Sequence, residues 1–258
     1  MRKQDAFTLI ELLVVIAVIA LLMAILAPSL GKAREQAKKV VCTAHMKGLG
    51  TALRLYVDDN NGKTHQSPNA GLWDNAWEGS SSVTPYGPND DKAYWGIAYH
   101  PYAQNKKIFR CPSTRRVDDW PEWGWGLAYQ QYFQYCSYGI NGYITWHSIQ
   151  RMDDVERNVK IDQDFKHHDE VIAFQDHVEQ KLDDNGDMFY LRRGDEINLT
   201  QWRNGGTLGK FPEAVQECFR HAGLSNTCWL DGHVGGIKET TGEDVPGYWY
   251  TGVRPSGT

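Results

Sequence analysis

The chain has 258 residues, a net charge of −5 at neutral pH and a mean hydropathy of −0.54. About 230 mostly polar residues follow an apolar N-terminal stretch, which is enough for one domain with a core of moderate size. The acidic balance gives no electrostatic footprint for nucleic acid, and no basic stripe appears in the soluble part, so we expect no nucleic-acid partner. The sequence contains no GxSxG, P-loop or dinucleotide-binding motif.

The first element is an apolar segment from Phe7 to Ala27 that carries one charge, Glu11. As a helix it spans about 30 Å, the hydrocarbon thickness of a bilayer, so we expect a membrane helix. A carboxylate one turn inside such a helix costs about 3 kcal/mol and needs a partner. A plain signal anchor is the alternative, in which the basic residues after the segment keep the C-terminal side in the cytoplasm: Lys32, Arg34, Lys38 and Lys39.

The same residues, FTLIELLVVIAVIALLMAILAP, resemble the N-terminus of type IV pilins and type II secretion pseudopilins. The resemblance implies that a prepilin peptidase cuts between Ala6 and Phe7 and that Phe7 is then N-methylated. It also implies that Glu11 pairs with the new terminal amine of a neighbouring subunit. Pro28 stands where the family has a helix-kinking proline. The family prefers glycine before the cut, so Ala6 is a departure that we expect to slow processing without preventing it.

The resemblance implies three parts: a cytoplasmic leader, 1–6, a transmembrane and assembly helix, 7–28, and a globular domain, 29–258, that includes the second half of the helix. The domain is expected in the periplasm, on a single-pass protein of the inner membrane, and at the cell surface or in a filament after assembly. The implied partners are a prepilin peptidase, an inner-membrane assembly platform, the membrane itself, and copies of this or other pilin-like subunits.

After Pro28 an amphipathic pattern predicts that the helix continues to about Val57, for a total length of about 75 Å. The residues DDNNG at 58–62 end it. We expect one stripe of side chains to pack on the domain: Val40, Val41, Ala44, Gly48, Leu49, Ala52, Leu53, Leu55 and Tyr56.

Residues 60–110 and 117–150 are rich in aromatic residues and in turn formers, so we expect long aromatic-rich loops. Two interpretations stay open. The aromatic side chains fill a core that has few regular elements, which is the interpretation we favour. Alternatively, exposed tryptophans form a surface that binds a polysaccharide or a protein partner.

Short apolar runs at 170–174 and 187–191 predict strands. The runs 225–230 and 233–238 flank Asp231-Gly232, a preferred two-residue hairpin turn. Strands that follow one long helix, without βαβ alternation, predict an α+β fold of pilin-like type in which the helix packs on an antiparallel sheet.

The segment RHAGLSNTCWLDGHV places His221 nine residues before Asp231-Gly232. This arrangement resembles the H-x9-DG signature found toward the C-terminus of many prepilin-type proteins. The stretches 42–63, 108–113 and 136–141 also resemble segments of that group. The resemblance indicates a class of protein and does not indicate a ligand.

Side chains suited to a metal or acid–base site occur near the predicted strands: Asp176, His177, His221, Asp231 and His233. We favour a structural interpretation, in which His221 bonds to turn backbone and Asp231 shapes the hairpin. Asp183, Asn185 and Asp187 surround a glycine turn and are candidate ligands for calcium, the one cofactor the sequence raises, although a solvated acidic turn is the default.

An exported domain with five cysteines suggests disulfides: Cys42, Cys111, Cys136, Cys218 and Cys228. Sequence distance favours pairing Cys218 with Cys228 and Cys111 with Cys136, and the odd number leaves one cysteine over. Five buried, reduced cysteines are the alternative.

Together these features predict a structural subunit, a pilin or pseudopilin of a type IV pilus or type II secretion filament, and not an enzyme. A minor tip subunit that uses an aromatic surface for adhesion is the alternative. A membrane-tethered, metal-dependent enzyme is a third hypothesis, which requires the histidines and aspartates to converge.

Overall fold

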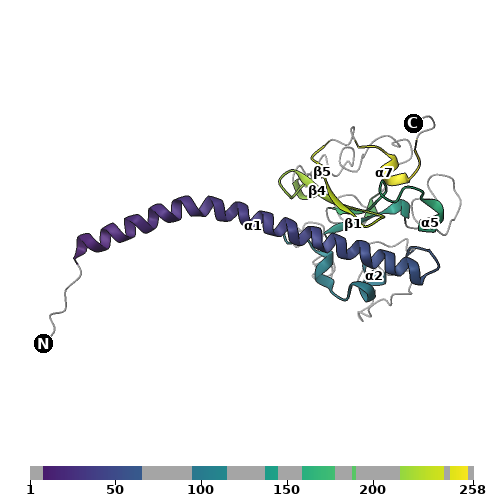
Figure 1. Cartoon of the computed structure of the whole chain (residues 1–258), viewed down its shortest axis with the longest axis horizontal. Coiled ribbons are helices and arrows are strands. Elements are labelled where there is room, and N and C mark those ends of the chain that lie inside the picture. The colour runs from purple at the N-terminus through teal and green to yellow at the C-terminus, as the bar shows by residue number, and fades with distance from the viewer. Residues whose placement is uncertain are drawn as a thin grey trace, which may run out of the picture.

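The computed structural model describes residues 8–65, 95–114, 137–144, 159–177, 188–189, 216–240 and 245–254. These contain a long helix, α1 (Leu9–Asp59), and a five-stranded sheet. Figure 1 shows the second half of α1 lying between the sheet on one side and the short helix α2 (Trp95–Ala103) on the other, while the first half projects away from the domain. The predicted α+β fold, a long helix packed on a sheet, is confirmed.

Helix α1 begins where Thr8 caps its first turn and continues through Pro28 to Asp59 without a break. Pro28 has no N–H to donate, and Figure 1 shows the ribbon curving gently along its length. At the far end the Asn60 N–H donates to the Tyr56 carbonyl (3.0 Å). The predicted continuous helix is confirmed, and it ends close to the predicted position.

The face of α1 that packs on the domain matches the predicted stripe only in part: Leu49, Ala52 and Leu53 are buried as predicted. The buried residues recur every three or four positions: Cys42, Met46, Leu49, Leu53 and Val57, with Gly50 and Ala52 beside them. Val40, Val41, Ala44 and Leu55 are exposed, so their predicted burial is wrong. The prediction placed the valines in the core because valine is hydrophobic. In the structure the helix is oriented so that Cys42 and Met46 lie in the core instead.

The sheet has the order β3-β1-β2-β4-β5. Its strands are β1 (Tyr138–Asn141), β2 (Ile172–Asp176), β3 (Met188–Phe189), β4 (Leu224–Trp229) and β5 (Val234–Lys238). Neighbouring strands pair antiparallel, except that β3 runs parallel to β1. The four predicted runs overlap β2, β3, β4 and β5. Strand β1 was not predicted, because Gly139 and Asn141, two of its four residues, are poor strand formers. Short helices complete the described chain: η2 (Lys106–Phe109), η4 (Gly142–Ile144), α5 (Ile161–Asp164) and α7 (Tyr248–Thr251).

Strands β4 and β5 form the predicted hairpin, but its turn is longer than predicted. The Gly232 N–H donates to the Trp229 carbonyl (2.8 Å), and the Trp229 N–H donates to the His233 carbonyl (3.0 Å). Gly232 has a φ of 83°, the left-handed conformation that closes longer hairpin loops. Asp231 and Gly232 therefore lie at the end of the turn, and the prediction of a two-residue turn is wrong.

Aromatic side chains fill much of the core between α1, α2 and the sheet. The ring of Trp95 lies 5.3 Å from that of Phe174 and 6.1 Å from that of Tyr99, and all three residues are buried. Such pairs add about 0.5–1.5 kcal/mol each beyond the area they bury. These rings agree with the core interpretation, while the aromatic residues within 66–94 and 115–136 lie outside the described residues.

Four cysteines are reduced and buried in the described part of the chain: Cys42, Cys111, Cys218 and Cys228. The predicted pairing of Cys218 with Cys228 is therefore wrong, because the extended strand β4 runs between them and carries them apart. The pairing of Cys111 with Cys136 is wrong as well, since Cys111 is unbridged; Cys136 itself lies outside the described residues.

Candidate functional site

The first candidate site is the projecting half of α1. From Leu9 to Leu30 its large apolar side chains are 44–81% exposed. The segment is long and apolar enough to cross a membrane. An exposed apolar surface of this extent is normally covered by lipid or by other apolar helices. This half of the helix is therefore a contact surface, and the described domain leaves it open.

Glu11 is the one charged residue in that segment, and it forms a capping box with Thr8. Its carboxylate accepts from the Thr8 N–H (2.9 Å) and hydroxyl (2.8 Å), while the Thr8 hydroxyl oxygen accepts from the Glu11 N–H (3.3 Å). The spacing T-x-x-E is the sequence signature of this motif, so the sequence alone could have revealed this local partner for Glu11. Ala6 and Phe7 lie outside the described residues.

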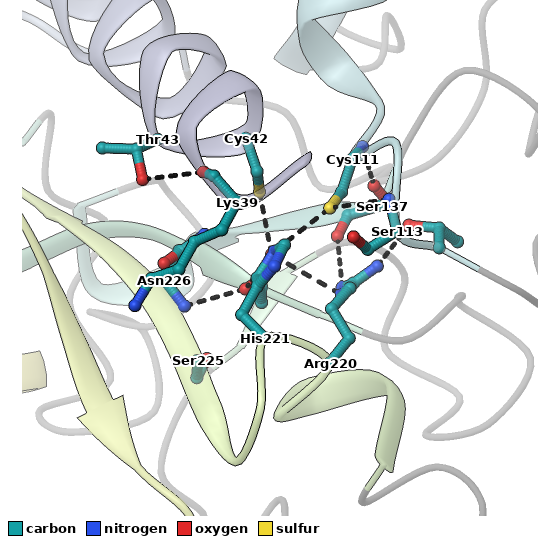
Figure 2. A network of polar contacts seen from close by, with 12 residues as sticks. Lys39, Cys42, Thr43, Cys111, Ser113, Ser137, Arg220, His221, Ser225 and Asn226 are labelled. Atoms are coloured by element: carbon teal, nitrogen blue, oxygen red, sulfur yellow. Dashed lines mark hydrogen bonds and ion pairs between the residues drawn. The ribbon is translucent and has the colours of Figure 1, made fainter. Parts of the chain in front are cut away.

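The second candidate site is a buried cluster at the contact between α1 and the sheet, drawn in Figure 2. Cys42 comes from α1, Cys111 follows η2, Asp176 ends β2 and His221 precedes β4. The two sulfur atoms, a carboxylate oxygen and a ring nitrogen all lie within 4.8 Å of one another. All four residues are buried, and we call them the Cys42–His221 cluster.

Three distances define the cluster. His221 Nε2 lies 3.2 Å from Cys111 Sγ and 3.6 Å from Asp176 Oδ2. Cys42 Sγ lies 3.7 Å from Asp176 Oδ1. Figure 2 shows the side chains of Cys42, Cys111 and His221 pointing toward one another from three different elements. Residues far apart in the sequence thus direct their donor atoms to one point.

Backbone groups hold the members of the cluster in place. The Cys111 N–H donates to the hydroxyl of Ser137 (2.6 Å), and the Ser113 N–H donates to Cys111 Sγ (3.4 Å). The Asn226 N–H of β4 donates to Asp176 Oδ2 (2.8 Å). Because these donors and acceptors belong to ordered turns and strands, the cluster is a fixed feature of the fold.

Arg220 places a buried cation beside the cluster. Its Nε lies 3.6 Å from Asp176 Oδ1, and its side chain is 3% exposed. Its guanidinium also donates to the carbonyls of Ser137 (2.8 Å) and His177 (2.6 Å). Glu217 reaches the same guanidinium at 3.8 Å. Arg220 is therefore held in place by backbone carbonyls, and its positive charge lies close to the Asp176 carboxylate.

The burial of the cluster changes its acid–base properties. Burial raises the pKa of Asp176 to about 7, against the opposing attraction of Arg220. Burial also raises the pKa of Cys42 far above its usual range. Burial acts in the same direction on Cys111, but hydrogen bonds with Cys42 and His221 and the charge of Arg220 outweigh it and lower the pKa to about 4.

The structure separates the other residues that the sequence singled out. Asp231 and His233 lie on the exposed hairpin, where Asp231 Oδ1 accepts from the His233 N–H (2.9 Å). Lys47 of α1 donates to the Gly232 carbonyl (2.7 Å). His221 therefore lies before β4 and Asp231-Gly232 lies after it. His221 belongs to the cluster, and Gly232 contacts Lys47 of α1. Asp183, Asn185 and Asp187 lie outside the described residues.

Cys42 and Cys111 are the members of the cluster that the sequence did not single out as ligands. Cysteines in an exported domain suggest disulfides first. The close spacing Cys218-x2-His221 associates His221 with a cysteine that is not part of the cluster. One sequence feature does connect Cys42 and Cys111 with His221. The stretches 42–63 and 108–113, which contain the two cysteines, both resemble segments of the H-x9-DG group.

Comparison with known proteins concerns the N-terminal part of the chain. Residues 1–27 match the family model of the prokaryotic N-terminal methylation motif. The chain is 47% identical over 64 residues, 25% of its length, to the type IV wide pilus major component PilA4 of Thermus thermophilus. It is 37% identical over 59 residues, 23% of its length, to the type II secretion system core protein G of Pseudomonas aeruginosa.

These alignments cover 49% and 42% of the two relatives, so the chain spans less than half the length of the curated relatives it matches. No solved structure matches the chain. The methylation motif at 1–27, the apolar helix that it opens and the two relatives lead to one conclusion. The chain has the prepilin-type N-terminus of type IV pilins and type II secretion pseudopilins.

Proposed function

We propose that the chain is a structural subunit of a type IV pilus-like or type II secretion-like filament. The observation that carries the proposal is the projecting half of α1, which is apolar, exposed and joined to the domain by unbroken helix. Two surroundings can cover such a helix: lipid before assembly, and the helices of other subunits in a filament. The methylation motif at 1–27 supports the second.

In this proposal a prepilin peptidase removes residues 1–6, and Phe7 is N-methylated. The subunit waits in the inner membrane with its domain in the periplasm, until an assembly platform moves it into the filament. Glu11 then meets the terminal ammonium of a neighbour's Phe7 in a core of low dielectric, and the pairing offsets the burial of both charges. Head-to-tail packing of this kind is heterologous and open, as a filament requires.

The proposed role is structural and involves no catalysis. Asp176 and His221 are the one predicted pair of acid–base residues that meet near Cys111 and Cys42, and they are 1% and 4% exposed. A substrate reaches them only if the core opens. This burial supports a structural role for the domain over the hypothesis of a membrane-tethered enzyme.

The intact mass and the N-terminal residue of the protein from native membranes test the proposal. We expect a chain that begins at N-methylated Phe7, and a sheared filament fraction that contains it. Ala6→Gly is the matched variant: it restores the glycine that the family prefers, so its cleavage should be as fast as that of the natural chain or faster. A chain that still begins at Met1 in both proteins would contradict processing and favour a plain anchor.

A further inference from the structure

We infer that Cys42, Cys111, Asp176 and His221 bind one zinc ion, which fastens α1 to the sheet. The site does not depend on filament assembly, because all four residues lie in the folded domain. The ion would act as a structural cross-link inside the subunit.

The donor atoms are those that zinc prefers. Thiolate sulfur, imidazole nitrogen and carboxylate oxygen are the usual protein ligands of Zn²⁺, and tetrahedral sets of mixed sulfur and nitrogen are typical of zinc among the transition metals. Four protein donors complete a tetrahedral shell and leave no position for water or substrate. A closed shell of this kind is typical of structural zinc.

The distances fit a tetrahedral ion. With Zn–S bonds of about 2.3 Å and Zn–N or Zn–O bonds of about 2.1 Å, a tetrahedron separates its ligand atoms by about 3.3–3.8 Å. The separations are 3.2 Å from Cys111 Sγ to His221 Nε2, 3.6 Å from His221 Nε2 to Asp176 Oδ2, and 3.7 Å from Cys42 Sγ to Asp176 Oδ1. The two Asp176 distances involve its two different oxygen atoms, and the other separations in the cluster lie within 4.8 Å, so side-chain shifts of up to about 1 Å complete the shell.

A buried cation lies beside the negative charges of the proposed site. Arg220 lies 3.6 Å from the Asp176 carboxylate and 3.8 Å from that of Glu217. On binding, the two thiols release their protons, as zinc ligands do, so two thiolates and two carboxylates carry four negative charges against three positive charges from the ion and Arg220. The net charge of −1 is the same as that of the two carboxylates and Arg220 with neutral thiols, so binding of the ion adds no unpaired charge to the core.

Groups around the cluster also resemble the outer shell of a metal site. The Tyr138 hydroxyl lies 3.1 Å from Cys42 Sγ, the Ser113 N–H donates to Cys111 Sγ, and the Asn226 N–H donates to Asp176. Hydrogen bonds of this kind orient ligands and tune their basicity. Because these hydrogen bonds already orient the ligand side chains, less side-chain movement is needed when the ion binds.

A disulfide between Cys42 and Cys111 is the competing fate of the two sulfur atoms. An oxidising compartment favours that bond, and it would leave Asp176 and His221 without an ion to bind. Zinc accounts for all four side chains, whereas a disulfide accounts for two. The two states differ in mass and in metal content, so a single preparation distinguishes them.

The test uses the full chain, purified in detergent without chelators and analysed for metals by mass spectrometry. We expect about one zinc ion per chain, and after replacement by Co²⁺ the intense visible bands and the thiolate charge-transfer band of a tetrahedral site. A folded chain that holds no zinc and gives no such spectrum after anaerobic reconstitution would overturn the inference. So would copper or iron at the cluster, or a Cys42–Cys111 disulfide found by peptide mapping.

Matched variants locate the ion. Cys42→Ser and Asp176→Asn should lower the zinc content at least about tenfold, because loss of a ligand opens the closed shell. Cys228→Ser removes a buried cysteine that is outside the cluster, so its zinc content should equal that of the natural chain. Equal zinc in all three variants would overturn the assignment. If the ligand variants fail to fold, the Co²⁺ spectrum of the natural chain still decides whether thiolates bind the ion.

Discussion

Glu11 has two possible partners, one within its own helix and one on a neighbouring subunit. In the free chain its carboxylate accepts from the Thr8 N–H and hydroxyl in a capping box. In the proposed filament the same carboxylate meets the neighbour's terminal ammonium. Glutamine also closes a capping box, but it carries no charge, so a substitution at this residue separates the two roles.

We expect Glu11→Gln to insert into the membrane normally and to impair assembly. Removing one partner of a buried ion pair costs about 3–5 kcal/mol, so the yield of sheared filaments should fall more than about tenfold. Thr8→Ala is the control, since it removes the cap, worth about 0.5–2 kcal/mol, and leaves the carboxylate in place. Filament yield near the natural level in Glu11→Gln, or an equal loss in both variants, would contradict the pairing.

At the scale of elements, α1 and the β4–β5 hairpin approach each other closely. A Cβ built on Gly50 would lie 2.7 Å from Cys228 Sγ and 3.6 Å from the Gly232 Cα. Lys47, one turn earlier on α1, donates to the Gly232 carbonyl. Gly50 lowers the intrinsic stability of the helix by about 1 kcal/mol relative to alanine, so its place in a helix interior has a packing reason. It lets the strand lie against the helix backbone.

We expect Gly50→Ala to lower the free energy of unfolding of the chain in detergent. Overpacking costs about 1–3 kcal/mol, which exceeds the gain of about 1 kcal/mol in helix propensity. Gly31→Ala is the control, because nothing lies within 4 Å of its added Cβ, and it should stabilise the helix or leave it unchanged. Urea unfolding measures both.

A second variant checks the cause of the Gly50 effect. Cys228→Ala removes the sulfur atom that the new Cβ would meet. In the double variant the loss of stability should be smaller than the sum of the two single losses, since the substitutions are in contact. Additive losses would show that the Cys228 contact is not the source of the cost.

At the scale of the whole molecule, the chain has two parts that share one helix. The first half of α1 exposes apolar side chains along its length, whereas the second half is the central element of a packed domain. Figure 1 shows that the two parts adjoin end to end. The domain core includes the face of α1 from Cys42 to Val57, so a cut before residue 42 leaves that face intact.

We expect a chain of residues 29–258 to be a monomer in buffer without detergent, because the truncation removes most of the exposed apolar surface. Its thermal unfolding should remain cooperative, since the buried face of α1 is retained. The full chain in the same buffer, the control, should aggregate. Analytical ultracentrifugation and circular dichroism measure the two properties. Persistent association of the folded, truncated chain would mean that the domain itself carries a self-association surface.

The sequence by itself determined the long helix, its apolar first half, its end near residue 59 and the α+β class. These follow from local composition and periodicity: one charge in the 21 residues from Phe7 to Ala27, a run of turn formers at 58–62, and short apolar runs in the second half. The methylation motif is equally local, because a peptidase recognises a short contiguous segment.

The tertiary structure alone decided which face of α1 is buried, how the cysteines are used and which titratable residues meet. Cys42 and Cys111 are separated by 69 positions in the chain and reach one point with Asp176 and His221 only after the helix docks on the sheet. Spacing along a chain carries no information about such a contact, since ligand atoms on four different elements need only converge in space. For this reason the sequence predicted disulfides, whereas in the structure two of the cysteines belong to a buried cluster of four residues.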